Sequence, residues 1–584
     1  MESLVTLLVG HRGAGKTTYL RGLRSIWAGE LLDLDEEIER VSGVSIAHLL
    51  NRGEREFRTV EQRVLHDLID GATSPTVIAV GAGYEGPLPT GAHVIWIRRE
   101  TDASGRVFLN RPRLNPNISP FQEYLQRLPE RTARYSEWAH EQLFVPEGYC
   151  AGLESFVLQS GSAHWHLPFD LTLFPENLRR WSGFWKKRLA WGIRRFELRD
   201  DLLTTDQMET VLRSVPHEHL LFSRRKPVGV APADLTTDWA LELGPPLDTS
   251  DVVSLHQRTK QLSSDMARLN EYESSGRLLK LAVEIRDFNE LRLGHEWWRE
   301  APEHRAFLPR SADGRWRWYR SLFGPMMPIH FIREGIGSGL DQPLLWQTLM
   351  QPLFRAHFGA VLGSPVRHSR SPVEHLPFAR EQGLPFVAID MHEDEFSAAV
   401  PLLRAWGLRF AAVTAPLKKL AFAVAEDVHP DARTFHSANS LFLDESGIRA
   451  HNTDALALKR IRGELPDYKL VWLWGGGGVK ASVRAAWPEI VEISAREGTQ
   501  EERVSPELLI WAVGRSREFR WPPSHLRPER VLDLNYTEDS PGLEWAVQRG
   551  LSYQSGLRMF ELQAEFQRCF WSECESQRMR RKRV

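Results

Sequence analysis

The chain has 584 residues, enough for about three or four domains, and its 42% hydrophobic and 26% charged content is that of ordinary globular proteins. A formal net charge of −2 provides no overall field that would attract nucleic acid or a membrane surface. No apolar run reaches the roughly 18 residues of a membrane helix, and the three cysteines fit a reducing cytoplasm. We therefore expect a cytoplasmic protein with no nucleic-acid or membrane partner. Its oligomeric state does not follow from the composition.

The first block, residues 1–150, is predicted to be an α/β domain. Apolar runs such as Leu4–Val9 and Val77–Val80 alternate with charged, helix-like stretches. An ATP site is predicted where the first strand meets the next helix, because the complete P-loop motif stands there: Gly10-His11-Arg12-Gly13-Ala14-Gly15-Lys16-Thr17.

The P-loop residues have separate expected tasks. The glycines let backbone N–H groups face the phosphates, Lys16 reaches the β and γ oxygens, and the Thr17 hydroxyl holds Mg²⁺. A plain glycine turn before a helix is the alternative, and the full motif after a strand disfavours it.

A phosphate loop does not identify the acceptor, but four later motifs do. In order they are Asp33-Leu34-Asp35, Gly53–Arg58, Gly81-Ala82-Gly83 and Arg111-Pro112. With the P-loop they resemble the shikimate kinase family across nearly all of residues 1–145. The resemblance implies that Asp35 contacts the acceptor hydroxyl and takes its proton, and that Asp33 lies near Mg²⁺. It further implies that Arg111 lies on a lid over ATP. The residues implied for the shikimate site are Arg58, Gly81, Gly83 and Arg131.

The second block, residues 165–350, contains about eight short apolar segments with helix-length material between most of them. The expected strands are Leu171–Phe174, Phe196–Leu198, Leu220–Phe222, Trp239–Leu243, Val252–Leu255, Leu278–Val283, Ala306–Leu308 and Met327–Phe331. This pattern predicts a short, (β/α)₈-barrel-like domain with trimmed helices.

Polar residues in and after these strands resemble type I 3-dehydroquinate dehydratase. The resemblance implies that Lys280 forms an imine with the substrate ketone and that His256 shuttles protons. Burial at a barrel mouth would lower the pKa of the lysine and free its amine. The residues implied for binding carboxylate and hydroxyls are Glu197, Arg199, Arg225, Arg320 and Gln342. Departures from the family pattern, such as Gln257 after the histidine, leave open a barrel that only scaffolds its neighbours.

The third block, residues 354–575, is predicted to be a two-lobed dehydrogenase with a Rossmann-type nucleotide domain. Its ordered motifs are Ser369-Arg370-Ser371, Val413–Lys418, Ala438-Asn439-Ser440, Asn452-Thr453-Asp454, Gly475–Gly478 and Gly556–Gln563. This set resembles shikimate dehydrogenase. The resemblance implies a catalytic pair, Lys418 and Asp454. It also implies that Ser369, Ser371 and Thr414 bind the substrate carboxylate. Asn439 and Gln563 would hold ring hydroxyls, with Tyr536 nearby.

The nucleotide site is expected at the glycine run, which follows a strand and opens a helix. Its glycines are Gly475, Gly477 and Gly478. Arg496, after the next strand, favours NADP because a basic residue reads the 2′-phosphate, whereas Glu497 leaves NAD open.

The three resemblances together match the last three domains of the fungal arom polypeptide. They imply dehydration of 3-dehydroquinate, reduction of 3-dehydroshikimate with NADPH, and phosphorylation of shikimate with ATP. One alternative is a bifunctional kinase and dehydrogenase with an inert barrel. The other is a sensor without turnover, similar to fungal quinate-pathway repressors. A sensor predicts broken motifs, whereas Lys16, Asp35, Lys418 and Asp454 are all retained.

Overall fold

The computed structural model describes residues 4–24, 27–100, 102, 120–145, 167–227, 234–335, 337, 339–366, 369–476, 479–498, 504–514, 518–536 and 540–581. The chain divides into two compact units. One holds Met1–Glu100, Pro129–Arg355 and Gly383–Pro385; the other holds Thr101–Leu128, Ala356–Gln382 and Phe386–Val584. Among the described helices, none combines the length and apolar character needed to span a bilayer.

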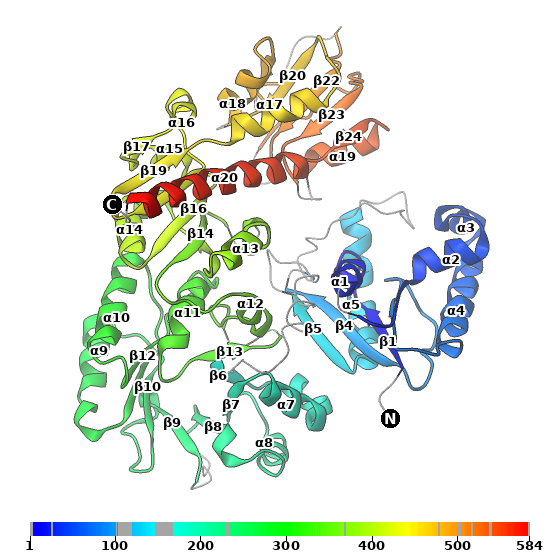
Figure 1. The fold of residues 1–584 in the computed structure, drawn as a ribbon. Helices are drawn as coiled ribbons and strands as arrows, with labels where there is room; N and C mark the ends of the chain where they lie inside the picture. Colours follow the sequence, from blue (N-terminus) through cyan, green and yellow to red (C-terminus); the bar gives the residue numbers. More distant parts are fainter. Residues whose placement is uncertain are drawn as a thin grey trace. The chain divides into compact units, whose positions relative to one another are not determined.

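The first block folds around a five-stranded parallel sheet with the order β2-β3-β1-β4-β5. Its apolar runs form the central strands, and β3 is buried along its whole length, as expected for a parallel strand covered on both faces. The P-loop follows β1 and so lies at the carboxyl edge of the sheet, where open α/β sheets bind ligands. The strands are β1 Val5–Val9, β2 Glu30–Asp33, β3 Thr76–Ala79, β4 His93–Arg99 and β5 Glu141–Val145; the helices are α1 Lys16–Leu23, α2 Leu34–Ser42, α3 Ile46–Arg52, α4 Glu54–Asp70 and α5 Pro120–Trp138 (Figure 1).

The second block contains eight strands that are hydrogen-bonded in the order β12-β11-β10-β9-β8-β7-β6-β13. All of these neighbours run parallel, and β13 pairs with β6, so the last strand returns beside the first. The strands are β6 Leu167–Thr172, β7 Ile193–Arg199, β8 Leu220–Arg224, β9 Thr236–Ala240, β10 Val252–Leu255, β11 Leu278–Leu281, β12 Arg305–Phe307 and β13 Phe331–Arg333.

Helices of this block are short or replaced by turns. The segment from β9 to β10 contains a single turn of 3₁₀ helix, η6, and no α-helix. The helices and 3₁₀ segments are η4 Pro175–Arg180, α7 Trp181–Ala190, α8 Thr205–Leu212, η5 His217–His219, η6 Leu241–Leu243, α9 Leu262–Asn270, η7 Glu273–Ser275, α10 Phe288–Glu300, α11 Arg317–Phe323, η8 Gly324–Met326 and α12 Leu345–Met350.

Two strands of this block are shifted by a few residues from their expected positions. The segment 239–243 holds only the end of β9, since Leu241 begins η6. The segment 327–331 overlaps β13 only at Phe331, where that strand begins. Pro328 has no N–H to donate to a sheet ladder, which disfavours a central strand through the segment 327–331.

The third block consists of two lobes, each with its own sheet. The first sheet is mixed, with the order β15-β14-β16-β18-β19-β17, and the second is parallel, with the order β21-β20-β22-β23-β24. The strands are β14 Phe358–Gly363, β15 Phe386–Asp390, β16 Leu408–Val413, β17 Asp427–Val428, β18 Ser440–Asp444, β19 Gly447–His451, β20 Val471–Gly475, β21 Val491–Ile493, β22 Leu508–Ala512, β23 Arg530–Asp533 and β24 Ser552–Gln554. The helices are α13 Ser371–Glu381, α14 Glu393–Ala405, α15 Lys418–Ala423, α16 Pro430–Phe435, α17 Asp454–Glu464, α18 Lys480–Ala486, α19 Pro541–Gln548 and α20 Leu557–Arg581.

Helix α20 connects the two lobes of this block. In Figure 1 it runs from the β20–β24 sheet to the sheet that contains β16. At its far end the indole N–H of Trp571 donates to the carbonyl of Leu441 in β18 at 3.0 Å. Near its start Met559 and Leu562 belong to the core of the parallel lobe.

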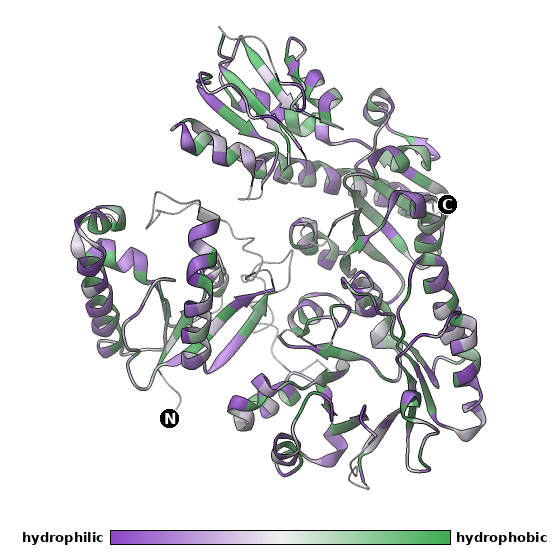
Figure 2. Cartoon of the chain, turned by 180° about the vertical axis from the view of Figure 1, so that it is seen from behind, coloured by the Kyte–Doolittle hydropathy of each residue, from purple (hydrophilic) through white to green (hydrophobic). Residues whose placement is uncertain are grey.

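Tryptophans supply much of the second core of the parallel lobe. Trp472, Trp474, Trp511 and Trp545 are each at most 1% exposed and pack in one cluster. Strands are mostly green and helices carry purple stretches in Figure 2, as expected for buried sheets covered by amphipathic helices. Several of the 21 tryptophans are thus accounted for by core packing.

Candidate active sites

The P-loop depends on glycines for its backbone conformation. Gly10, Gly13 and Gly15 have φ of 154°, 75° and 101°, values that L side chains rarely adopt. Helix α1 then begins at Lys16, whose buried ammonium donates to the carbonyls of Gly10 at 2.7 Å and His11 at 3.1 Å. The lysine therefore lies across the loop whose N–H groups would face phosphates.

Oxygen ligands suited to Mg²⁺ meet beside this loop. The Thr17 hydroxyl donates to Asp33 Oδ2 at 2.7 Å. Asp33 also caps α2 by accepting the backbone N–H of Asp35 at 3.1 Å, which holds its carboxylate in place. A hydroxyl and a carboxylate are the hard donors that Mg²⁺ takes from a protein when phosphates supply the rest.

Four residues predicted to line the acceptor site lie together: Asp35, Arg58, Gly81 and Gly83. A Cβ built on Gly81 would lie 3.3 Å from Asp35 Oδ1 and 2.7 Å from Glu61 Oε1. A Cβ on Gly83 would collide with the guanidinium of Arg58. The two glycines thus leave room for a carboxylate and an arginine to line one site.

Glu61 is a buried carboxylate of this site that the sequence prediction missed. It accepts a hydrogen bond from Arg58 at 2.7 Å and is 1% exposed. Burial raises the pKa of Glu61 to about 7 against the opposing charge of Arg58, and the carboxylate of Asp35 adds to the rise. The i, i+3 spacing of Arg58 and Glu61 in α4 was a signal that could have identified the pair.

Arg131 is a buried cation on α5 whose charge reaches the P-loop. Burial, together with the charges of Lys16 and Arg131, lowers the pKa of His11 to about 3. His11 Nε2 lies 3.0 Å from the hydroxyl of Thr132, the next residue of α5. Arg111, which was also predicted for this block, lies outside the described residues.

A cavity of about 160 Å³ lies at the carboxyl ends of strands in the second block. Strands β7 and β11, and the segments that follow β8, β10, β12 and β13, all contribute side chains to it. The structure therefore brings together all seven residues predicted for this block: Glu197, Arg199, Arg225, His256, Lys280, Arg320 and Gln342.

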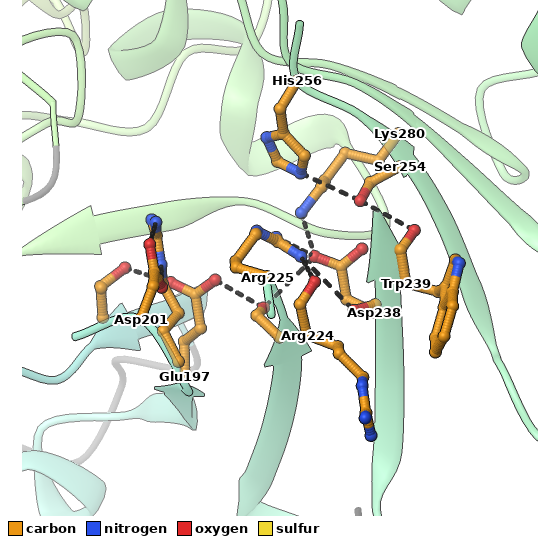
Figure 3. A network of polar contacts seen from close by, with 12 residues as sticks. Glu197, Asp201, Arg224, Arg225, Asp238, Trp239, Ser254, His256 and Lys280 are labelled. Atoms are coloured by element: carbon orange, nitrogen blue, oxygen red, sulfur yellow. Dashed lines mark hydrogen bonds and ion pairs between the residues drawn. The ribbon is translucent and has the colours of Figure 1, made fainter. Parts of the chain in front are cut away.

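Lys280 is the buried ammonium of this cavity. It is ion-paired with Asp238 of β9, which also accepts from Arg225 at 2.6 Å (Figure 3). Burial lowers the pKa of Lys280 to about 8, because the loss of hydration outweighs the attraction of Asp238. Burial acts to raise the pKa of Asp238, but the charges of Arg225 and Lys280 hold it well below its usual range.

Asp238 was missed by the sequence prediction. Only one signal pointed to it: a carboxylate in a strand that is otherwise buried is costly unless it is paired. Its partners come from β11 and from the residue after β8, so no short motif contains the group.

Hydroxyl groups orient the acceptors around Lys280. Glu197 accepts from Thr172 at 2.5 Å and from Ser223 at 2.6 Å, and the amide of Gln342 donates to Thr172 at 3.0 Å. His256 Nε2 lies 2.9 Å from the hydroxyl of Ser254. Glu197, Gln342 and His256 are thus each held by a neighbouring hydroxyl group.

The cavity carries a strong positive charge that modifies its own groups. Burial, together with the charges of Arg225 and Lys280, lowers the pKa of His256 well below its usual value. Burial also lowers the pKa of Arg320 to about 10. Arg199 pairs with Asp201 at 2.6 Å. Such a site is suited to an anionic substrate, and its histidine is neutral at physiological pH.

Lys418 and Asp454 form the ion pair of the third block. Lys418 Nζ lies 2.6 Å from Asp454 Oδ2, and the amide of Asn439 donates to Asp454 Oδ1 at 2.8 Å. Asn439 also accepts from the backbone N–H of Thr453 at 2.9 Å. The pair joins the starts of α15 and α17, so two helices hold the ammonium against the carboxylate.

The predicted carboxylate site lies at the start of α13. Ser369 donates to Ser371 at 3.1 Å, and both are 6% exposed. Burial raises the pKa of the Tyr536 hydroxyl, which hydrogen-bonds with Ser369. Thr414 packs against Gly363, where a Cβ would collide with its methyl group.

Helix α20 reaches this site from the other lobe. The backbone carbonyl of Gln563 accepts from Thr453 at 3.3 Å, so the residue predicted to hold a ring hydroxyl lies beside the Asn439 network. One turn on, Gln567 donates to the carbonyl of Asn439 at 2.7 Å. Gln567 was not predicted, and its i, i+4 spacing from Gln563 was the available signal.

The nucleotide lobe has the backbone of a dinucleotide site at its first strand. Gly475 ends β20 with φ 88° and Gly476 follows with φ 118°, so the chain can turn tightly towards α18. Gly477 and Gly478 lie outside the described residues. Arg496 is exposed in the turn after β21, at the position expected for a 2′-phosphate contact.

Fold and sites define an α/β protein with a P-loop kinase domain and a two-lobed dehydrogenase fold that includes a Rossmann-like parallel sheet. Residues 12–143 match the family model described as shikimate kinase. Residues 361–441 match the one described as shikimate dehydrogenase substrate binding domain. A shikimate kinase domain and a shikimate dehydrogenase domain are therefore present in the chain. Neither match extends into residues 165–350.

Curated relatives of the chain include shikimate dehydrogenases. The chain is 35% identical over 158 residues to a shikimate dehydrogenase (NADP(+)) of Anaeromyxobacter sp. (strain Fw109-5), covering 25% of this chain and 56% of the relative. It is 29% identical over 245 residues to that of Hydrogenovibrio crunogenus (strain DSM 25203 / XCL-2), covering 35% and 88%. The chain spans about half the length of the first of these relatives. The shikimate 5-dehydrogenase of Thermus thermophilus, solved with NADP(H) and shikimate, is 25% identical, with coverage of 37% and 94% and a TM-score of 0.32.

Proposed function

We propose that this chain catalyses three consecutive steps on one ring acid. The second block dehydrates 3-dehydroquinate, the third reduces 3-dehydroshikimate to shikimate, and the first phosphorylates shikimate. The proposal rests chiefly on the Lys418–Asp454 ion pair beside Asn439, in a domain similar to shikimate dehydrogenases. The P-loop and the Asp35–Arg58 site, in a domain similar to shikimate kinases, support the last step.

In the first block, the side chains align a substrate hydroxyl with a phosphate. ATP with Mg²⁺ supplies the phosphoryl group, and Thr17 and Asp33 would hold the ion. Arg58, which also donates to Glu61 at 2.7 Å, supplies the cation that binds the shikimate carboxylate. Asp35 accepts the proton of the attacking hydroxyl, while Lys16 stabilises charge on the phosphate oxygens. Further contacts to the ring, the carboxylate and ATP are assigned by resemblance to Gly81, Gly83, Arg131 and Arg111.

In the third block, Lys418 gives a proton to the carbonyl oxygen of 3-dehydroshikimate as its carbon is reduced. NADPH supplies the hydride, so one hydride and one proton convert the ketone to the hydroxyl of shikimate. Asp454 keeps Lys418 charged and oriented, and Asn439 binds a ring hydroxyl. The substrate is held further by Ser369, Ser371, Thr414, Tyr536 and Gln563.

NADP is the proposed nucleotide of the third block. An exposed arginine after β21 is available for a 2′-phosphate, and the relatives described above are named as NADP(+) enzymes. Glu497, the next residue, keeps NAD as the alternative. In the Arg496→Ala variant we expect kcat/KM for NADP⁺ to fall while that for NAD⁺ changes little. Equal losses with both nucleotides would remove Arg496 from this role.

We further propose that the second block is a (β/α)₈ barrel with dehydratase activity. The parallel order with β13 beside β6 supports the barrel, and the seven residues around one cavity support the activity. Lys280 would attack the ketone of 3-dehydroquinate and release water to form an imine. His256 would then remove the proton next to the imine and return it to the leaving hydroxyl. Hydrolysis of the imine gives 3-dehydroshikimate and restores the lysine.

Turnover separates this proposal from a sensor that only binds ligands. Shikimate with NADP⁺ should yield NADPH and 3-dehydroshikimate, and shikimate with ATP should yield ADP and shikimate 3-phosphate. Lys418→Met should abolish only the first reaction and Lys16→Met only the second. Lys419→Met changes the exposed neighbour of Lys418 and should leave both intact. Thermal stabilisation by shikimate without either product would establish the sensor.

An inert barrel is tested separately, because the ion pair with Asp238 leaves Lys280 committed to a neighbour. Borohydride reduction in the presence of 3-dehydroquinate should add the substrate mass to Lys280. Lys280→Met should lose the adduct, whereas Lys260→Met, a change at an exposed lysine, should keep it. Absence of an adduct in the wild-type chain, with both end reactions intact, would identify a bifunctional enzyme with a scaffold barrel.

A further inference from the structure

Two histidines and an aspartate meet at the edge of the mixed sheet, and none of them belongs to the sites described above. His429 and Asp431 lie at the start of α16, and His451 is the last residue of β19. One ligand atom from each lies within 4.8 Å of the others. His429 Nδ1 is 3.5 Å and His451 Nε2 3.6 Å from the same oxygen, Asp431 Oδ2.

These separations match ligands that share one ion. Two donors at about 2.0–2.1 Å from a tetrahedral Zn²⁺ lie roughly 3.3–3.5 Å apart. Small side-chain rotations would therefore bring both imidazoles and the carboxylate to bonding distance. A surface cluster formed by chance would not need to aim two imidazoles at one carboxylate oxygen.

The cluster is held by the fold. The two imidazole rings are 3.8 Å apart between centroids and nearly perpendicular, at 88°. His451 is buried and stacks on Phe570 of α20, while the backbone N–H of His429 donates to Ala450 at 2.9 Å. Strand β19 and the start of helix α16 thus hold the two histidines next to each other before any ligand binds.

Within the described part of the chain, His451 Nδ1 is buried and has no hydrogen-bond partner. The atom that faces Asp431 is the other ring nitrogen, Nε2, so the spacing of the three ligand atoms, and not the unpartnered Nδ1, is what points to an ion. His429 Nδ1 accepts the backbone N–H of Asp431 only at 3.3 Å, a long bond that an ion could replace.

We propose that His429, Asp431 and His451 bind one divalent transition-metal ion, Zn²⁺ before others, with water in the fourth position. Two imidazoles and one carboxylate are a ligand set that Zn²⁺ favours, whereas Mg²⁺ and Ca²⁺ prefer oxygen alone. Asn452, Thr453 and Asp454 follow His451 directly. The ion would therefore tie α16 to the segment that carries Asp454, and its role is to stabilise that segment.

Metal uptake by the full-length chain tests the proposal. After treatment with a chelator, the protein is incubated with Zn²⁺, desalted and analysed for bound metal; Co²⁺ is used in parallel for its visible absorption. The wild type should retain one more ion per chain than Asp431→Asn or His429→Gln, with the strong absorption of tetrahedral Co²⁺. Zn²⁺ should raise the unfolding temperature of the wild type and not that of the two variants.

His525→Gln is the matched control, because it removes an exposed histidine of the same chain outside the cluster. It should behave as the wild type, with affinity at least about tenfold above that of His429→Gln. His429 is 46% exposed, so its substitution leaves the fold intact and decides the question even if Asp431→Asn does not fold. Equal Zn²⁺ retention by wild type and His429→Gln overturns the proposal, and shikimate turnover in the same samples is independent of this result.

Discussion

At Lys280, two electrostatic effects oppose each other within one side chain. Loss of hydration favours the neutral amine, and the carboxylate of Asp238 favours the ammonium. The loss of hydration is the larger effect, so the pKa of Lys280 falls to about 8. The amine is therefore partly neutral near physiological pH, as an imine-forming lysine requires. Asp238 retains enough attraction to keep the side chain directed into the cavity.

The rate of borohydride trapping should follow this pKa. Below pH 8 the neutral amine increases about tenfold per pH unit, so trapping with 3-dehydroquinate should rise with pH and level off above about pH 8. Asp238→Asn removes the charge that favours the ammonium and should move the midpoint to lower pH. Asp248→Asn, at an exposed aspartate, should leave it in place. A profile that is flat from pH 6 to 9 would show that Lys280 is not the titrating nucleophile.

Glu61 should make the first block less stable as pH rises. Its pKa is about 7 in the folded chain and near 4.5 when the group is hydrated. Between these values the folded state binds more protons than the unfolded state, so unfolding becomes easier from about pH 4.5 to pH 7. Glu61→Gln should flatten this trend in thermal unfolding measured across that range. Glu56→Gln, at an exposed position of the same helix, should keep the wild-type slope; an equally steep decline in Glu61→Gln would refute the assignment.

At the scale of elements, the sequence predicts those sites whose chemistry is carried by adjacent residues. The P-loop could be read directly because its glycines, lysine and threonine act within one strand-turn-helix. Asp238 could not, because it acquires its partners only when β9 lies beside the neighbouring strands. Strand β13 was expected at 327–331 but begins at Phe331. The apolar pattern that predicted it takes no account of the missing N–H of Pro328. The seven cavity residues of the second block were predictable by resemblance, but the network of Thr172 and Ser223 that orients Glu197 was not.

Helix α20 is the element that relates the two lobes of the third block, and Trp571 is its main contact with β18. The indole is 1% exposed, packs on Phe410 with a centroid distance of 4.9 Å and donates to Leu441. Trp571→Ala should cost about 3–5 kcal/mol of stability. It should also raise the KM for shikimate in the NADP⁺ reaction, since Gln563 and Gln567 lie on the same helix.

Cys569→Ala provides the control for this helix, because Cys569 is exposed on α20 two residues before Trp571. Its effect should stay within about 0.5 kcal/mol. Denaturant unfolding gives the stability, and initial rates give KM. If Trp571→Ala lost stability with an unchanged KM, α20 would serve the fold of the lobe and not the position of the substrate residues.

On the scale of the molecule, residues 1–100 and 129–355 belong to one compact unit, within which buried ion pairs join the first block to the second. The side chain of Glu100, just after β4, is 7% exposed and accepts from Arg317 at 2.7 Å and from Arg333 at 2.8 Å. Arg333 in turn donates to the backbone carbonyl of Gln342 at 3.2 Å, next to the cavity. A carboxylate of the kinase domain thus neutralises two buried cations of the second block.

Glu100→Gln should therefore uncouple the two blocks. It leaves two buried guanidinium groups without their carboxylate, which costs about 3–5 kcal/mol when one partner of a buried pair is removed. In the wild type we expect one calorimetric transition for both blocks, shifted as a whole by ATP and Mg²⁺. In Glu100→Gln the transition should split, and only the kinase part should respond to nucleotide. Glu303→Gln, at an exposed glutamate of the second block, should unfold as the wild type does. A single nucleotide-sensitive transition in Glu100→Gln would mean that apolar contacts, and not this carboxylate, hold the unit together.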